Sequence, residues 1–199
     1  MLSFIYKFRC RRYFRMILFI DCCVRNDSRT KRLAEAFLKL LDGDVERIKL
    51  EDVKFPVVDE AFLTRRDMLK ADGNYDDPIF DLGRRFASAD TIVIAAPYYD
   101  LSFLASLKQY IEQINVSGLT FSYTPQGTPV GICKANDLYY ITTAGGTFCP
   151  EEFGFGYIKA LAENFYGIKN NRMIAAVGLD IDGADPEKII SEAIDNLKI

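Results

Sequence analysis

Short apolar runs recur along the chain and are separated by segments with helical periodicity. Four runs have the length and composition of buried strands, at 17–23 (ILFIDCC), 91–96 (TIVIAA), 138–143 (LYYITT) and 172–177 (RMIAAV). A fifth segment, 45–50 (VERIKL), alternates between apolar and polar positions, which is typical of a more exposed strand. The pattern therefore predicts five strands.

Apolar residues at helical spacing fill the intervals between these strands. The first helix follows cap candidates at 26–28 and stops at Gly43, because glycine commonly ends a helix. Proline is favoured in the first turn of a helix, so Asp77-Pro78 and Asp185-Pro186 mark two further starts. The remaining helices are expected near 59–70, over 104–114 and from Glu151 to Phe165.

Strands that alternate with helices predict an α/β fold with a parallel sheet and helices on both of its faces. Five strands in about 180 residues suit the doubly wound order 2-1-3-4-5, whose ligands bind beyond the carboxyl ends of the strands. The loops 22–30, 97–101 and 143–148 are expected to meet at that edge. Residues 120–133 are predicted to form a small hairpin around 125–127, inserted before the fourth strand.

The composition is that of one folded domain. With 199 residues and 49% hydrophobic content the chain is long enough to bury one sizeable core. Its apolar runs fall far short of the ~20 residues that a membrane span needs. A net charge of −3 gives no general attraction to nucleic acid, so we expect neither a membrane span nor a nucleic-acid partner.

The charge is unevenly distributed. Residues 1–15 carry five basic side chains and no acid, and the apolar stretch that follows is too short for a signal peptide. We therefore expect 1–15 to be a basic extension upstream of a natural start at Met16, and 16–199 to be the folded domain. The alternative is a native extension that binds something acidic.

Cysteine and histidine content narrows the chemistry. The five cysteines form no CxxC pair and the chain has no histidine, so the usual zinc frameworks are missing and no metal site is expected. The absence of histidine also excludes Ser-His and Cys-His nucleophilic catalysis. Unpaired thiols fit a reducing compartment, so a cytoplasmic location is expected. Cys22 and Cys23 are interpreted as buried strand thiols rather than a redox pair.

The first of the three loops leads from a strand into a helix N-terminus. Free N–H groups and the helix dipole favour an anion there, and the loop adds the hydroxyls of Ser28 and Thr30 and the charges of Arg25 and Arg29. Together they predict a phosphate site. The alternative is ordinary helix capping with solvated arginines.

The second and third loops suit a flat ligand. Tyr98 and Tyr99 each offer an apolar face with a polar tip. Gly145 and Gly146 allow the main chain to approach a ligand closely. Rim packing by the tyrosines and a plain glycine turn are the alternatives. The later segment 180–185, which superficially resembles a calcium loop, is interpreted as a turn and helix cap, because its glycine is misplaced and the bidentate glutamate is absent.

Five segments in this order resemble a known family. They are the Ser28-Arg29-Thr30 helix start, APYYDLSFLASLKQYIE from Ala96, GLTFSYTPQG, the ITTAGG loop and the late YIKALAENFYGIKNNRMIAAVGLD. Over 16–197 the chain resembles the flavodoxin-like NAD(P)H:quinone oxidoreductase and FMN-dependent NADH-azoreductase family. The resemblance implies bound FMN, NAD(P)H as hydride donor, a quinone or azo acceptor and a homodimer with its sites at the interface.

The resemblance also implies roles for individual residues. Arg25, Ser28 and Thr30, with Arg29 beside them, would hold the FMN phosphate. The isoalloxazine ring and the ribityl chain would be lined by the second loop, which consists of Pro97, Tyr98, Tyr99, Asp100 and Leu101. The ring's polar edge would be approached by Thr143, Ala144, Gly145 and Gly146 of the third loop.

Two of the loops depart from the family pattern. The second often reads P-M-Y-N-F in the family and is P-Y-Y-D-L here, so Asp100 stands where asparagine is usual. A carboxylate near the flavin would disfavour the anionic reduced form. The third loop often carries Ser-Arg before its glycines, whereas this chain has Thr143-Ala144.

The reaction implied by the resemblance is a ping-pong transfer of two electrons from NAD(P)H through FMN to the acceptor. No catalytic residue is identified, and Tyr98, Tyr99 or solvent could supply the proton. Two alternatives stay open: a flavodoxin-type one-electron carrier, and a flavodoxin-fold interaction module that has lost FMN.

Overall fold

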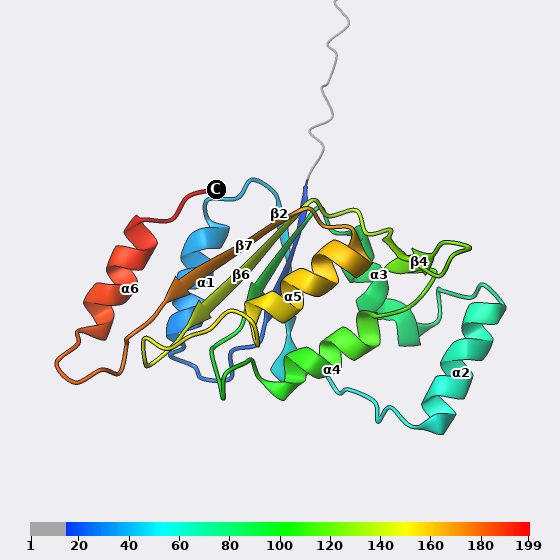
Figure 1. Ribbon diagram of the computed structural model, residues 1–199, viewed down its shortest axis with the longest axis horizontal. Helices are drawn as coiled ribbons and strands as arrows, with labels where there is room; N and C mark the ends of the chain where they lie inside the picture. The colour runs from blue at the N-terminus through cyan, green and yellow to red at the C-terminus, as the bar shows by residue number, and fades with distance from the viewer. Residues whose placement is uncertain (1–14) are drawn as a thin grey trace, which may run out of the picture.

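The computed structural model describes residues 15–199. Five parallel strands form the central sheet in the order β2-β1-β3-β6-β7 (Figure 1). Their bounds are β1 Met16–Asp21, β2 Asp44–Lys49, β3 Thr91–Ala95, β6 Asp137–Thr143 and β7 Asn170–Ala176. In strand sequence this is the predicted order 2-1-3-4-5, so the doubly wound flavodoxin-like fold is confirmed. Residues 1–14 of the extension expected at 1–15 lie outside the described residues.

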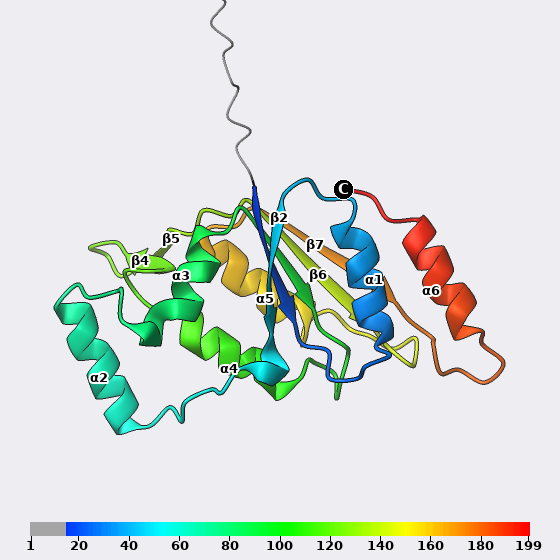
Figure 2. The same cartoon turned by 180° about the vertical axis from the view of Figure 1, so that it is seen from behind.

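Helices cover both faces of the sheet, as predicted (Figures 1 and 2). One face carries α1 (Arg29–Leu38) and α6 (Pro186–Asp195). The other carries α3 (Asp81–Ser88), α4 (Ala105–Ile114) and α5 (Phe155–Leu161), with 3₁₀ turns at Leu50–Asp52 and Pro78–Phe80. The remaining helix, α2 (Glu60–Ala71), stands away from the sheet and buries none of its residues.

The sheet separates two hydrophobic clusters because side chains alternate between its faces. Leu18 and Ile20 of β1 face the cluster beneath α3, α4 and α5. Ile17 and Phe19 of the same strand face the cluster beneath α1 and α6. This alternation explains why near-continuous apolar runs, rather than alternating ones, predict the strands of a sheet covered on both sides.

The hairpin expected at 120–133 is present. Its strands are β4 (Phe121–Tyr123) and β5 (Pro129–Gly131), paired antiparallel. It packs against the π-helical turn Ala162–Tyr166 that continues α5. The contact is close enough that a Cβ on Gly131 would lie 2.0 Å from the main-chain nitrogen of Gly167.

The helix predicted from Glu151 begins later than expected. Residues 151–154 form turns in which Glu151 O accepts the N–H groups of Gly154 (3.2 Å) and Gly156 (2.6 Å), and the helix begins only at Phe155. Two glycines so close together weaken helix formation, and here they permit a turn. No helix within 15–199 has both the length and the apolar character that crossing a bilayer needs.

Candidate active site

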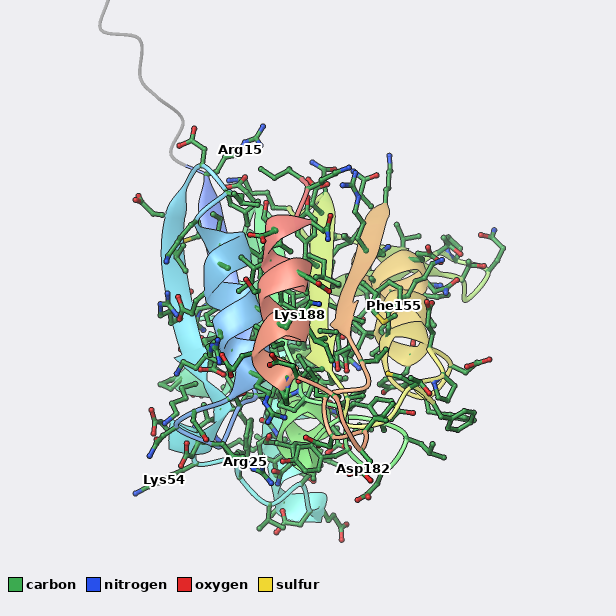
Figure 3. All side chains as sticks on the ribbon, turned by 90° about the vertical axis from the view of Figure 1, so that its left-hand side faces the viewer. Arg15, Arg25, Lys54, Phe155, Asp182 and Lys188 are labelled. Atoms are coloured by element: carbon green, nitrogen blue, oxygen red, sulfur yellow. The ribbon has the colours of Figure 1, made fainter. Side chains whose placement is uncertain are left out.

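A cavity of about 220 Å³ opens at the carboxyl ends of β1, β3 and β6. This is the edge of the sheet at which the three loops were predicted to meet. Figure 3 shows Arg25 and Asp182 at this end of the molecule and Arg15 at the opposite end. The wall consists of Arg25, Asp27, Ser28, Arg29, Thr30, Tyr98, Tyr99, Thr143, Ala144, Gly145, Leu179 and Asp180.

Most of the residues proposed from sequence meet in this wall, and four of the second and third loops do not. Pro97, Asp100, Leu101 and Gly146 are absent from it, although their neighbours in the chain contribute to it. Conversely, Asp27, Leu179 and Asp180 line the cavity and were not expected there. Leu179 and Asp180 belong to the segment after β7, a fourth loop at the same edge of the sheet.

The first loop is shaped by a helix cap and by an ion pair whose carboxylate is buried. Ser28 caps α1, and its Oγ accepts the N–H of Lys31 at 3.3 Å. Lys31 Nζ lies 3.1 Å from Asp21 Oδ2, while Asp21 Oδ1 accepts the N–H of Cys23 at 2.9 Å. The first turn of α1 contains no acidic residue, so its N–H groups face the cavity wall without a competing carboxylate on the helix itself.

Thr30 joins the first loop to the third. Its Oγ1 lies 2.6 Å from Oγ1 of Thr143, and both residues are buried. The carbonyl of Thr143 also accepts the N–H of Tyr98 at 3.1 Å. Hydrogen bonds therefore connect all three loops. Either hydroxyl can be the donor of the Thr30–Thr143 bond, so Thr30 can offer an anion its main-chain N–H and, where Thr143 is the donor, its own O–H as well.

The second loop contains a tight turn in a strained conformation. Tyr99 and Ser102 exchange main-chain hydrogen bonds of 2.9 and 2.7 Å. Between them Asp100 (φ 49°) and Leu101 (φ 68°) both have the left-handed conformation that glycine adopts most readily. The turn directs both side chains to the exposed surface, which explains their absence from the cavity wall. Ser102 Oγ donates to the carbonyl of Phe153 (2.6 Å), which ties this turn to the segment just before α5.

The surroundings of the Tyr98 side chain affect its acidity. The Tyr98 hydroxyl is buried and has no hydrogen-bond partner within the described residues. Burial raises its pKa, and the neighbouring Cys149 and Glu152 raise it further. The phenol therefore holds its proton tightly at neutral pH.

Burial also keeps the thiols of Cys22 and Cys23, near the site, in the protonated form, which is the less reactive one. Burial raises the pKa of Cys22 well above its ordinary value, with contributions from Cys23 and Asp21. Burial also raises the pKa of Cys23 to about 12. Both thiols are free and buried, as the sequence predicted.

The fourth loop brings an acidic side chain over the glycine of the third. Asp180 N–H donates to the carbonyl of Gly145 (2.9 Å), and Leu179 N–H donates to the carbonyl of Ala144 (3.2 Å). Asp180 Oδ1 accepts from Nη1 of Arg29 at 2.8 Å. The predicted turn and cap follow directly, because Asp185 caps α6 by accepting the N–H groups of Glu187 and Lys188. The sequence feature that could have indicated this fourth loop is its position directly after the last strand, because ligands of this fold bind beyond the carboxyl ends of the strands.

The wall has the donor set that the expected FMN requires. The N-terminus of α1 with Ser28, Arg25 and Arg29 suits a phosphate. Gly145 lies in the wall beside it and has no side chain of its own, and Tyr98 and Tyr99 supply aromatic surface. The residues present therefore fit the phosphate and the flat, polar-edged body of this cofactor.

Comparison with known proteins agrees with the fold. The family described as flavodoxin-like fold matches residues 15–198. An FMN-dependent NADH:quinone oxidoreductase of Clostridium perfringens (strain ATCC 13124) is 34% identical over 191 residues, covering 90% of this chain and 94% of the relative. The enzyme of the same description from Caldicellulosiruptor bescii is 37% identical over 180 residues, covering 84% and 87%.

Solved structures show the same fold. The azoreductase from Bacillus anthracis str. Sterne superposes with a TM-score of 0.77 at 23% identity, covering 92% of this chain and 96% of that one. An FMN-dependent NADH-azoreductase from Bacillus anthracis str. Ames Ancestor, solved in complex with FMN, gives a TM-score of 0.73 at 23% identity, covering 92% and 95%. This chain is therefore an oxidoreductase that belongs to the flavodoxin-like family of FMN-dependent NADH:quinone oxidoreductases.

Proposed function

We propose that this chain is an FMN-dependent oxidoreductase that passes two electrons from NADH to quinones or azo compounds. The observation that carries the proposal is the cavity where a capped helix N-terminus, two arginines, a glycine loop and two tyrosines meet. Relatives that match nearly the whole chain are described as FMN-dependent NADH:quinone oxidoreductases, which supports the same cofactor and donor here. We also expect the protein to accept NADPH as electron donor.

Each part of the wall has a separate task in this proposal. Ser28, Arg25, Arg29 and the first-turn N–H groups of α1 would hold the phosphate. Tyr98 and Tyr99 would border the ring, and the main chain of 143–146 would face its polar edge. When bound, FMN supplies the hydride chemistry, so the protein's own contribution is position and electrostatics. Because the pKa of Tyr98 is raised by burial, solvent or Tyr99 is the better source of the acceptor's proton.

We propose a ping-pong order, in which oxidised nicotinamide leaves before the acceptor enters. The cavity at this edge supports the order, because donor and acceptor would occupy the same place in turn. Parallel lines in double-reciprocal plots at several acceptor concentrations are expected. Intersecting lines would contradict the order and leave the cofactor assignment standing.

We also propose a homodimer with its two sites at the interface. A cavity of about 220 Å³ is smaller than the ~300–1,000 Å³ usual for small-molecule pockets, so one subunit encloses part of the cofactor. Large apolar side chains are exposed on the loops at this edge, namely Val24, Leu101, Phe148, Phe153 and Ile181. A group of exposed apolar side chains is typical of a surface that a partner covers. Analytical ultracentrifugation with and without FMN tests this expectation.

The central experiment is an anaerobic absorbance spectrum of the purified protein before and after NADH. Flavin bands that NADH bleaches rapidly are the expected result. Bands that persist with NADH would favour a one-electron carrier of the flavodoxin type. No flavin binding, even after FMN is added, would favour an interaction module and remove the site assignment. A matched pair of variants, Arg25→Gln and Lys169→Gln, separates loss of the phosphate site from general loss of surface charge, because Lys169 is also exposed and lies outside the cavity wall.

A further inference from the structure

Asp180 places a carboxylate within a cavity otherwise suited to an anion. The residue lies in the loop between β7 and α6, at the end of the molecule where Figure 3 labels Arg25 and Asp182. Its N–H bond to the Gly145 carbonyl fixes its main chain across the third loop. Its side chain lies directly over Gly145, because a Cβ built there would come within 2.5 Å of Asp180 Oδ2. Glycine at 145 therefore leaves room for this carboxylate.

The carboxylate pairs with one of the two arginines of the proposed phosphate site. Asp180 Oδ1 lies 2.8 Å from Nη1 of Arg29, the first residue of α1. The pair is open to solvent, with side-chain exposures of 36% for Arg29 and 68% for Asp180. An exposed ion pair of this kind contributes little to folding stability, so its effect on the fold is a weak reason for its presence.

The pair alters the charge balance of the cavity. Arg25 and Arg29 are the basic residues of the wall, and Asp27 and Asp180 are its acidic ones. The wall is thus neutral, although a phosphate monoester carries a charge near −2 at neutral pH. A phosphate that approached Arg29 would also meet the negative charge of Asp180.

We propose that Asp180 sets the affinity of the site by competing with the phosphate of FMN for Arg29. Binding of FMN then exchanges the Arg29–Asp180 ion pair for an Arg29–phosphate pair, and the repulsion between carboxylate and phosphate weakens the complex. The inference rests on the proposed function, since it concerns the same phosphate site. If Asp180 instead held Arg29 in place for the phosphate, replacing Asp180 by asparagine would weaken FMN binding rather than tighten it.

The test is a titration of the apoprotein with FMN and with riboflavin, followed by quenching of flavin fluorescence. Asp180→Asn keeps the side-chain shape and the main-chain bond to Gly145 and removes the charge. Removing one negative charge a few ångströms from a dianion should tighten FMN binding by about tenfold, which is about 1.4 kcal/mol. Riboflavin has no phosphate and should bind the variant and the wild type equally.

Two further variants make the test specific. Asp182→Asn removes an exposed charge two residues away and should leave both titrations unchanged. Arg29→Gln should itself weaken FMN binding, because the arginine that the phosphate would take over is missing, and should leave riboflavin binding unchanged. FMN affinity of Asp180→Asn equal to or weaker than that of the wild type would overturn the inference. So would an equal gain in Asp182→Asn, or a gain for riboflavin as large as that for FMN.

Failure of the inference and failure of the proposed function give different results. Wild-type protein that binds FMN, with no difference in Asp180→Asn, overturns the role of Asp180 and leaves the FMN site in place. Wild-type protein that binds neither flavin removes the phosphate site and with it the competition at Arg29.

Discussion

The hydrogen bond between Thr30 and Thr143 makes a quantitative prediction about how the loops of the site are held together. Thr30→Val and Thr143→Val each remove one hydroxyl at nearly constant shape and leave the other hydroxyl buried. The described residues record no second partner for either group, so the remaining hydroxyl loses its hydrogen bond. A buried polar group left unpaired costs about 1–3 kcal/mol, so each single variant should lose about 2 kcal/mol of unfolding free energy.

The double variant should be far less unstable than the sum of the singles. Replacing both partners by apolar groups is nearly neutral, so the loss should be about 1 kcal/mol or less, and the coupling free energy about 3 kcal/mol. Urea unfolding followed by circular dichroism measures all three variants. Thermal melts should show each single variant about 4–8 °C below wild type, given about 2–4 °C per kcal/mol for a chain of this size.

A matched control lies next to Thr143 in β6. The hydroxyl of Thr142 is buried and has no partner in the described part of the chain, so Thr142→Val removes a hydroxyl without breaking a bond. It should leave the unfolding free energy unchanged or raise it. If the two single losses simply add in the double variant, the hydroxyls do not act as a pair, and the account of how loops one and three are joined fails.

Three further predictions concern the fold. Gly131→Ala should lose about 1–3 kcal/mol in urea unfolding, since its Cβ would meet main chain at Gly167, whereas Gly146→Ala, with open space around it, should be nearly neutral. Asp185→Ala should lose about 1 kcal/mol because it removes the cap of α6, and an unchanged midpoint would refute that role. Burial raises the pKa of Cys23 to about 12, so the native state keeps a proton that the unfolded chain releases above about pH 9. Cys23 alone should therefore lower the unfolding free energy by up to about 1.4 kcal/mol per pH unit between about pH 9 and 12, and Cys23→Ala should reduce the slope by that amount.

The sheet and the edge that carries the site could be read from the sequence because both depend on local patterns. Runs such as TIVIAA are apolar at every position only when both faces of a strand are covered, and the alternation with helices then limits the topology. Glycine and proline positions marked most boundaries. The late start of α5 is an exception, because its glycines could fit either a helix or the turn that forms.

The contacts that shape the cavity could not be read in the same way. Asp180 meets Arg29 across 151 residues of sequence, and Thr30 meets Thr143 across 113. Nothing in the residues near Asp180 indicates an ion-pair partner as far away as Arg29. The segment 180–185 is equally typical of a turn followed by a helix cap. The turn at Asp100 and Leu101 was also hidden, since neither residue is a glycine and their left-handed conformation follows from their tertiary setting.

The two clusters on either side of the sheet have a consequence for how this protein can change. Neighbouring residues of β1 belong to different clusters, so inserting or deleting one residue within the strand would send every following side chain to the wrong side. Substitutions in one cluster, by contrast, should add to those in the other, because they share few partners. Changes in length are thus confined to the loops, and the loops at the carboxyl edge carry the site. New substrate preferences can arise there by insertion while both halves of the interior keep their packing.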